Sequence, residues 1–269
     1  MPLVVCPTPI GNLEDVTIRV LRELGEADLV LCEDTRRTRT LLQRHDVRAK
    51  LLSYHRLNEE KRITEVLPRL EAGERIALAS DAGLPALNDP GARLISAALE
   101  RGLDVVVLPG PSAIETALVA SGLVGDRYSF VGYVPRDHEG RERLWVDTDR
   151  WRWPVVAFDS PRRLPSTLAS LAAASPERQV AVCRELTKRF EEVVRGPAHE
   201  VAAHFREPPK GEVTLVLGAG AGSEGDHLAT EAVAAVAELA DAGLPRRRAA
   251  DVVARLTGVS RNRLYRDSL

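Results

Sequence analysis

Residues 33–36 of this sequence, Glu-Asp-Thr-Arg, place two carboxylates, a hydroxyl and a guanidinium directly after the apolar run 28–32. A carboxylate can take a proton from a hydroxyl, and a guanidinium can hold an anionic oxygen. Polar groups at the carboxyl end of a strand are where α/β proteins carry out their chemistry. Asp34 or Thr35 could also cap the helix that we expect over 36–44. The two roles are compatible, and both stay open at this point.

His55, Asn58 and Glu59 follow a second apolar run, 51–54. The imidazole and the carboxylate are further candidates for moving a proton. A histidine in a loop is often only a polar surface residue, and Asn58 and Glu59 could simply begin the next helix. The residues alone leave both interpretations open.

Two more polar clusters follow apolar runs in the second half of the chain. They are Asp-Ser-Pro-Arg-Arg at 159–163 and Arg-Glu-Leu-Thr-Lys at 184–188. Such clusters are usually solvated surface with weak ion pairs. Their position directly after strands favours a site instead.

Three loops rich in Gly, Pro and Ala also follow apolar runs, at residues 7–12, 80–91 and 109–113. Small residues let a ligand approach the backbone, Gly11 can take a positive φ in its turn, and Asp81 could accept a hydrogen bond from a ligand. Neither GxGxxG nor GxxxxGK[ST] occurs in these loops. They therefore indicate a ligand held by backbone and apolar contacts rather than a nucleoside triphosphate.

The order of apolar runs and helical segments predicts an α/β protein. The near-continuous apolar run 104–108 is typical of a central strand in a parallel sheet. A second α/β unit follows, and the Gly-rich stretch 218–225 then breaks the chain. We predict an N-terminal α/β domain over 1–120, a second α/β domain over 121–218, a Gly-rich linker over 219–226 and a helical domain over 227–269.

The C-terminal segment shows two expected helices joined by a turn containing Gly258, the pattern of a helix-turn-helix. From Leu244 to Leu269, seven arginines oppose two aspartates. This local positive charge favours contact with nucleic acid. The alternative is a small helical cap kept soluble by its arginines.

Composition sets further bounds. The chain has 269 residues, 44% of them hydrophobic, which suffices for two medium-sized cores. The net charge of −2 provides no global attraction for nucleic acid, so any such attraction must be local. Three cysteines at spacings that match no metal site, and no leader-like start, suggest a reducing cytoplasm. We expect neither a membrane span nor a metal.

Nine motifs together resemble the family of 16S ribosomal RNA ribose 2′-O-methyltransferases that modify a cytidine of the decoding centre. That family belongs to the tetrapyrrole methylase superfamily, which uses S-adenosylmethionine. The resemblance implies two α/β domains with the methyl donor in the cleft between them, a homodimer, and 16S rRNA or the small ribosomal subunit as partner. The motifs, in order, are PTPIGNLED, EDTR, YHRLNE, SDAGLPALNDPG, LPGPSA, SPRR, RELTKRFEE, KGE and GVSRNRLY.

The resemblance also implies roles for particular residues. The donor pocket would use Ile10, Gly11, Asp81, Ala82, Gly83, Leu84, Gly110, Pro111, Ser112, Ala113 and Phe158. The substrate side would use Asp34, Thr35, Arg36, His55, Asn58, Glu59, Arg163, Glu185 and Lys188. In the helical domain, Arg261, Arg263 and Arg266 would contact RNA. The chain departs from the family pattern at Asp159, where Glu is usual, and at Arg56-Leu57, where His-Glu is usual.

A ribose hydroxyl needs a base, and alignment with the methyl group, to become a nucleophile. The candidate bases are Asp34, His55, Glu59 and Glu185, and Lys188 or Arg36 could lower the pKa of the hydroxyl or hold a neighbouring phosphate. Two other functions remain open: methylation of a small tetrapyrrole, which has no use for an arginine-rich tail, and a ligand-sensing DNA-binding regulator, which needs no bases.

Overall fold

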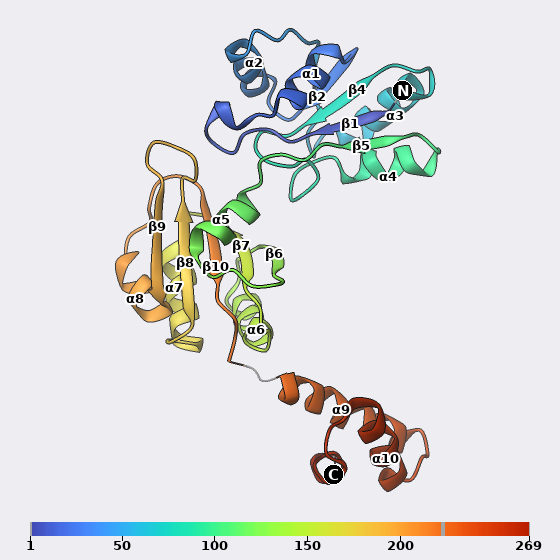
Figure 1. Cartoon of the computed structure of the whole chain (residues 1–269), viewed down its shortest axis with the longest axis vertical. Coiled ribbons are helices and arrows are strands. Elements are labelled where there is room, and N and C mark those ends of the chain that lie inside the picture. Colours follow the sequence, from blue (N-terminus) through green and yellow to red (C-terminus); the bar gives the residue numbers. More distant parts are fainter. Residues whose placement is uncertain (1, 222–223, 269) are drawn as a thin grey trace.

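The computed structural model describes residues 2–221 and 224–268. It contains two five-stranded sheets and a separate group of C-terminal helices (Figure 1). The predicted architecture is confirmed: two α/β domains are followed by an all-helical C-terminal domain.

The first sheet is wholly parallel, with the strand order β3-β2-β4-β1-β5. Its strands are β1 (Leu3–Cys6), β2 (Leu29–Cys32), β3 (Leu51–Ser53), β4 (Ile76–Ala79) and β5 (Val105–Val107). The prediction of a central strand over 104–108 is wrong, because β5 lies at the edge and Val107 is 54% exposed. An apolar run alone does not distinguish a strand with two neighbours from a strand with one.

Helices cover both faces of this sheet. Leu3, Leu31 and Leu78 pack with α3 and α4, whereas alternate residues such as Val4 and Val30 pack with α1 and α2. This alternation follows from the two-residue period of a strand. The covering elements are the short 3-10 helix η1 (Leu13–Asp15) and α1 (Ile18–Glu26), α2 (Thr35–Arg44), α3 (Glu59–Glu71) and α4 (Ala92–Glu100).

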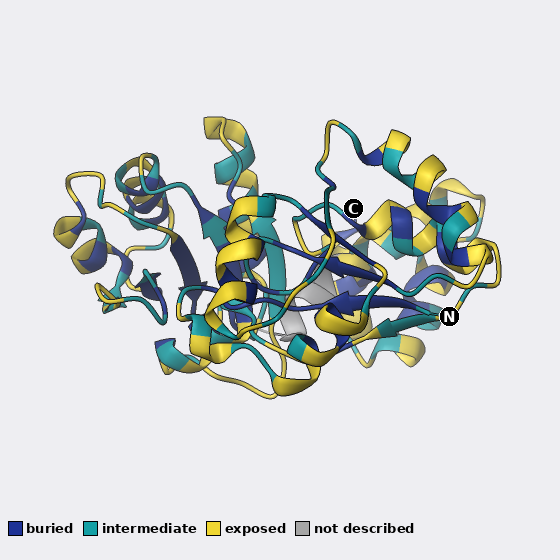
Figure 2. Cartoon of the chain, turned by 90° about the horizontal axis from the view of Figure 1, so that it is seen from above, coloured by how far each residue is buried: buried dark blue, intermediate teal, exposed yellow. Residues whose placement is uncertain are grey.

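The second sheet is mixed, with the order β6-β7-β10-β8-β9 and only β6 and β7 parallel. Figure 2 shows its interior strands buried and the helices exposed on their outer sides. The strands are β6 (Ser129–Tyr133), β7 (Val155–Asp159), β8 (Gln179–Arg184), β9 (Glu192–Pro197) and β10 (Val213–Leu217). One face is covered by α6 (His138–Asp149), α7 (Leu164–Ala174) and α8 (Ala198–His204).

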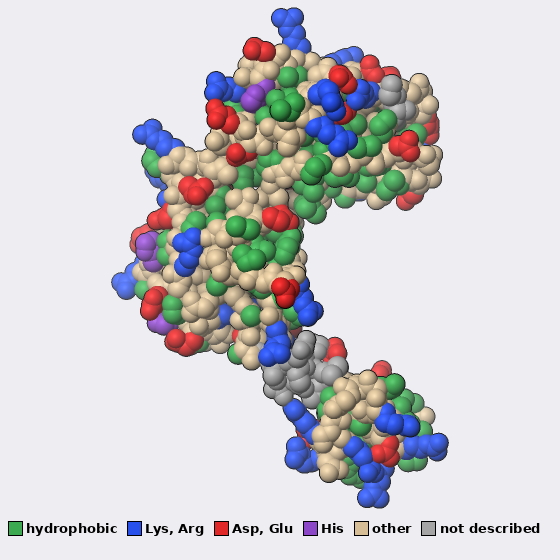
Figure 3. Space-filling view, viewed as in Figure 1, with side chains coloured by type: hydrophobic (Ala, Val, Ile, Leu, Met, Phe, Trp, Pro, Cys, Tyr) green, Lys and Arg blue, Asp and Glu red, His purple; other side chains and the backbone are tan. Residues whose placement is uncertain are grey.

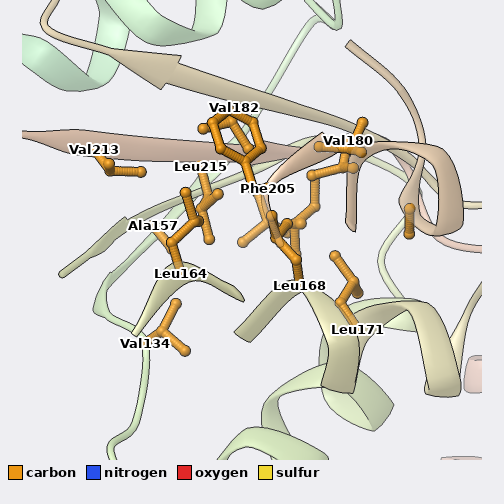
Figure 4. Packing of buried hydrophobic residues seen from close by; sticks show 14 of the residues in the cluster. Val134, Ala157, Leu164, Leu168, Leu171, Val180, Val182, Phe205, Val213 and Leu215 are labelled. Atoms are coloured by element: carbon orange, nitrogen blue, oxygen red, sulfur yellow. The ribbon is translucent and has the colours of Figure 1, made fainter. Parts of the chain in front are cut away.

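The packing on that face is apolar throughout. Figure 4 shows Leu164 and Leu168 of α7 and Phe205 after α8 among the valines of β8 and the leucine of β10. Helix α6 was not predicted, because its charged sequence lacks a clear apolar period, yet Trp145 is buried in this core.

Helix α5 (Ala113–Ser121) covers the opposite face of the second sheet. Its Ile114, Ala117 and Leu118 pack with Val156 and Cys183. A domain boundary after residue 120 assigns to the first domain a helix whose contacts are with the second sheet. The loop before α5 therefore joins the two sheets.

The C-terminal helices α9 (Glu224–Asp241), α10 (Arg246–Thr257) and α11 (Arg261–Asp267) share a core of their own. Figure 3 shows them as a separate lobe with Lys and Arg side chains on its surface. Gly258 ends α10 in the left-handed conformation that the predicted turn needs. Helix α9 begins inside the predicted linker 219–226, of which residues 222 and 223 lie outside the described chain. No described helix has the length and hydropathy needed to cross a bilayer.

Candidate active site

A cavity of 470 Å³ lies where loops of the two sheets meet. The first sheet contributes loops after β1, β2 and β4, and the second contributes the end of β7 and the start of β10. This volume is within the usual range for small-molecule sites. Of the residues implied for the donor pocket, those that line the cavity are Ile10, Asp81, Ala82, Gly83, Leu84, Ser112, Ala113 and Phe158.

Two further cavities share walls with the first. One of 340 Å³ includes Gly11 and Lys188 and shares Asp81 with the main cavity. The other, of 490 Å³, includes Gly110 and Pro111 and shares Ile10 and Ser112. All eleven implied donor residues therefore line one of three neighbouring cavities.

The loop after β1 is tied to both sheets. Thr8 and Gly83 exchange two backbone hydrogen bonds of 2.9 Å, and the amide of Asn12 donates to Thr187 Oγ1 at 3.0 Å. A Cβ on Gly11 would lie 2.5 Å from Lys188 Cγ. The expectation of a positive φ at Gly11 is wrong: the glycine is needed because the loop of the second sheet approaches its backbone so closely.

Gly110→Val is expected to weaken binding of S-adenosylmethionine at least tenfold. A Cβ at this position would lie 2.8 Å from Pro7 Cβ, so the side chain must push the loop before α5 away from the loop after β1. Displacement of a loop that lines the cavities removes backbone contacts from a ligand. Calorimetric titration with the donor measures the change, and a melting temperature near that of the wild type separates it from unfolding. Wild-type affinity would contradict this role of the loop.

Asp34 caps α2, as one of the two interpretations predicted. Its Oδ1 accepts a hydrogen bond from the Arg36 amide at 2.9 Å, and its carboxylate is paired in two places with the Arg36 guanidinium, at 3.1 and 2.7 Å. The hydrogen bonds from Arg36 hold the pKa of Asp34 well below its usual range. Thr35 is the first residue of α2. The hydrogen bonds of the Asp34 carboxylate are therefore made within its own loop and the start of α2.

Asp81 holds the β2 and β4 loops together. Its Oδ1 accepts from the Asp34 amide at 2.9 Å, and its Oδ2 lies 3.6 Å from Arg37 Nη1. Arg37 lines both the main cavity and the cavity that includes Lys188.

His55, Asn58 and Glu59 line none of the three cavities. Asn58 Oδ1 accepts from the His55 amide at 2.8 Å, and its Nδ2 lies 3.1 Å from His55 Nε2. Glu59 is buried and accepts from the Tyr54 hydroxyl at 2.7 Å and from the Gly91 amide at 3.2 Å. Burial and the hydrogen bond to Glu59 raise the pKa of Tyr54. Glu59 therefore braces the loop that carries Asp89.

Glu185 and Lys188 form one ion-pair network with Glu212. Lys188 Nζ lies 2.8 Å from Glu185 Oε1 and 2.8 Å from Glu212 Oε2. Glu185 Oε1 also accepts from the Glu212 amide at 2.9 Å. Hydrogen bonding to Lys188 lowers the pKa of Glu185. Lys188 therefore lines the 340 Å³ cavity beside Gly11, and its positive charge is already paired with Glu185 and Glu212.

Arg163 bonds to residues at the ends of β6 and β7 in the second sheet. Its Nη1 donates to the Val134 carbonyl at 3.0 Å, and its Nη2 lies 2.7 Å from Asp159 Oδ1. Burial raises the pKa of Asp159, a residue that also contributes to the wall of the main cavity. Phe158 packs edge-on against Tyr133 at a centroid distance of 5.5 Å and closes the apolar side of the cavity.

Sequence reasoning assigned no site role to several polar residues that line the main cavity: Glu33, Arg37, Asn88, Asp89, Tyr133, Ser160, Glu212 and Thr214. Glu33 and Arg37 stand beside residues that the motifs had singled out, and Asp89 lies within SDAGLPALNDPG. The signal was therefore present, but the sequence does not say which neighbouring side chain faces the cavity.

The three arginines implied for RNA contact are all paired. Arg261 Nε lies 2.5 Å from Asp251 Oδ1, Arg266 Nε lies 2.8 Å from Asp267 Oδ1, and Arg263 lies 3.6 Å from Asp267. Exposed Arg247, Arg248 and Arg255 of α10 have no acidic partner within 4 Å among the described residues.

Two family models match the chain. The model described as Tetrapyrrole (Corrin/Porphyrin) Methylases matches residues 2–202, which is more than half of the chain. The model described as RsmI C-terminal HTH domain matches residues 226–267. The helix-turn-helix prediction for the C-terminal helices is thereby confirmed.

Curated relatives are similar over nearly the full length. A protein of Escherichia coli O157:H7 named Ribosomal RNA small subunit methyltransferase I is 39% identical over 271 residues, covering 99% of this chain and 94% of the relative. The chain belongs to this family. A protein of the same name from Thermotoga maritima is 43% identical over 216 residues, covering 80% of this chain and 97% of the relative. Family membership confirms the resemblance seen in the nine motifs, and S-adenosylmethionine as the donor.

Solved structures show the same fold at low identity. A uroporphyrin-III C-methyl transferase from Thermus thermophilus, complexed with S-adenosyl homocysteine, superposes with a TM-score of 0.57 at 18% identity, covering 81% of this chain and 97% of that chain. A diphthine synthase superposes with a TM-score of 0.63 at 14% identity, covering 81% and 90%.

Within residues 2–221 and 224–268, no three His, Cys, Asp or Glu side chains are grouped so that they could hold a metal ion. The three cysteines are buried, and burial raises the pKa of Cys6 to about 12 and that of Cys183 to about 11. Such thiols behave as small apolar side chains.

Proposed function

We propose that this protein transfers a methyl group from S-adenosylmethionine to the ribose 2′-hydroxyl of a cytidine in the decoding centre of 16S rRNA, on the small ribosomal subunit. The observation that carries the proposal is the combination, in one chain, of the cavity between the two sheets and a helix-turn-helix domain rich in arginine. The names of the relatives support ribosomal RNA as the substrate class.

The main cavity suits the donor. Its walls combine the apolar side chains of Ile10, Leu84 and Phe158 with backbone exposed at Gly83, and Arg37 is the one cation among the described residues that line it. The donor carries a cationic sulfonium, an adenosine and an amino acid. Binding it requires apolar walls together with a few carboxylates and backbone groups. The bound donor supplies an electrophilic methyl group.

The residues of this chain then act on the nucleophile. The loops that line the cavity hold the ribose oxygen in line with the methyl carbon, and this alignment lowers the barrier to methyl transfer. Arg37 and Lys188 flank the adjoining cavity and can hold phosphates of the substrate strand. Arg36, which is exposed beside them, can add a further phosphate contact.

The test is methyl transfer from labelled S-adenosylmethionine to small ribosomal subunits lacking the modification, to free 16S rRNA and to a porphyrinoid. We expect label in the subunits, in a nucleotide whose 3′ linkage resists alkaline hydrolysis, since a 2′-O-methyl group blocks that cleavage. Label in the porphyrinoid would favour the small-molecule methylase, and label in neither would favour the DNA-binding regulator.

We further propose that the protein works as a homodimer in the cytoplasm. Exposed apolar side chains, among them Val107, Val119 and Tyr128, offer area that a second copy would cover. Light scattering of the purified protein gives the mass that decides between one and two copies.

A further inference from the structure

Three carboxylates from two loops line the main cavity: Glu33 from the loop after β2, and Asp81 and Asp89 from the loop between β4 and α4. They lie close enough that Glu33 and Asp81 both act electrostatically on Asp89. Asp81 is occupied by the Asp34 amide and by Arg37. Glu33 and Asp89 make no hydrogen bond or ion pair with any residue that the structure describes.

A base must offer a free lone pair to the hydroxyl that it deprotonates. The base must also reach the bound substrate, and the acidic candidates from the sequence, Asp34, Glu59 and Glu185, line none of the three cavities. Among the described carboxylates that line the main cavity, Asp81 and Glu212 are paired with cations, and Asp159 pairs with Arg163 while its unpartnered Oδ2 is buried. Of the described carboxylates of this cavity, Glu33 and Asp89 are left unpaired.

The loop around Asp89 is held in a defined conformation. Asn88 has a φ of 62° and Gly91 a φ of 136°, and a Cβ on Gly91 would lie 2.7 Å from Leu78 Cδ2. The Gly91 amide is fixed by buried Glu59 at 3.2 Å. Unusual backbone conformations persist where surrounding contacts enforce them, often at active sites. Glu59 therefore helps to hold the backbone of the loop that carries Asp89.

The surroundings of Asp89 favour its protonated form. Burial, then the charge of Glu33, then that of Asp81 raise the pKa of Asp89 to about 6. The other charged or titratable groups lining the cavity are Arg37, which is paired with Asp81, and Tyr133, Asp159 and Glu212. A base works best when its pKa is near the working pH, and Asp89 is closer to it than an ordinary aspartate.

We propose that Asp89 is the general base for the methyl transfer and that Glu33 is a positioning residue that tunes it. The inference rests on the proposed function. The ribose 2′-oxygen gives its proton to the Asp89 carboxylate and forms a bond to the methyl carbon. The carbon–sulfur bond breaks with its electron pair left on sulfur, and Asp89 releases the proton to water.

The decisive variant is Asp89→Asn, assayed with small ribosomal subunits, with Asp104→Asn at the opposite end of the first sheet as the matched control. Asp89→Asn is expected to reduce single-turnover methylation at pH 8 by ~100-fold or more, while calorimetry shows donor binding retained within a few-fold. Its melting temperature at pH 8 is expected to equal or exceed that of the wild type, since a repelled, partly buried charge is removed. Asp89→Glu should recover part of the rate.

The pH profile separates a base from a structural residue. For the wild type, kcat/KM is expected to rise about tenfold per pH unit below pH ~6 and to level off above it. Glu33→Gln removes a neighbouring negative charge, so the midpoint should move to lower pH.

Near wild-type turnover in Asp89→Asn would overturn the proposal, as would loss of donor affinity that accounts for the whole loss of rate. Loss of the high-pH plateau of kcat/KM in Glu33→Gln, together with an active Asp89→Asn, would make Glu33 the base and would also overturn the proposal. Absence of methylation by the wild-type protein and by Asp104→Asn would instead refute the proposed function.

Discussion

Arg178→Ala is expected to lower the free energy of unfolding of the second α/β domain by ~3 kcal/mol. Arg178 is only 7% exposed. Its guanidinium donates to the Gly218 carbonyl at 3.0 and 2.9 Å, to the Thr148 carbonyl at 3.0 Å and to Thr148 Oγ1 at 3.1 Å. Burial lowers its pKa to about 10, which still leaves it charged at neutral pH. Truncation removes four hydrogen bonds and leaves two buried carbonyls without these donors.

The measurement is urea unfolding followed by tryptophan fluorescence. All three tryptophans, Trp145, Trp151 and Trp153, lie in α6 or between α6 and β7, so the signal reports on this domain. Arg206→Ala is the matched control, because Arg206 is exposed and has no hydrogen-bond or ion-pair partner to lose among the described residues. Equal stability of the two variants would show that the Arg178 hydrogen bonds contribute nothing net.

Ending the chain at Ser223 is expected to weaken binding to small ribosomal subunits by ~100-fold at low salt and to flatten its salt dependence. Lys and Arg that neutralise phosphates release counterions, so each lost phosphate contact lowers the salt slope by ~0.7–0.9. Donor binding is expected to stay unchanged, because the three helices have their own core and contribute no described residue to the three cavities.

Two triple variants refine this test. Changing Arg247, Arg248 and Arg255 to Ala should reduce the salt slope by ~2–3, since these arginines have no acidic partner among the described residues. Changing Arg261, Arg263 and Arg266 to Ala should reduce it less, because Asp251 and Asp267 already offset their charge. Unchanged subunit affinity in a truncated protein of normal melting temperature and mass would contradict a role of the C-terminal helices in binding the subunit. Loss of the dimer instead would show that the helices serve assembly.

Local sequence signals identified the loops that form the cavity, because Gly, Pro and Asp after an apolar run mark the end of a strand regardless of the rest of the fold. They could not show which of two adjacent carboxylates faces the cavity. Which carboxylate faces the cavity depends on where α2 begins. Asp34 caps α2 and bonds to that helix, so Glu33 is the carboxylate that lines the cavity with Asp81 and Asp89.

Other differences between the sequence-based expectations and the structure also come from contacts between distant parts of the chain. The edge position of β5 is set by which strands pair, a long-range property that an apolar run such as 104–108 does not contain. The need for glycine at position 11 comes from Lys188, which lies far along the chain. The ion pair of Arg261 with Asp251 depends on how α10 and α11 pack.

The hydrogen bonds that join Thr8 to Gly83 and Asn12 to Thr187 bear on how tightly a small ligand can be held. Ordering mobile loops around a ligand costs free energy, and this cost offsets part of the attraction between the ligand and the walls. Here the walls of the cavity are already linked across both sheets before anything enters. The pocket is preorganised, so little free energy goes into fixing the chain, and most of the attraction appears as affinity.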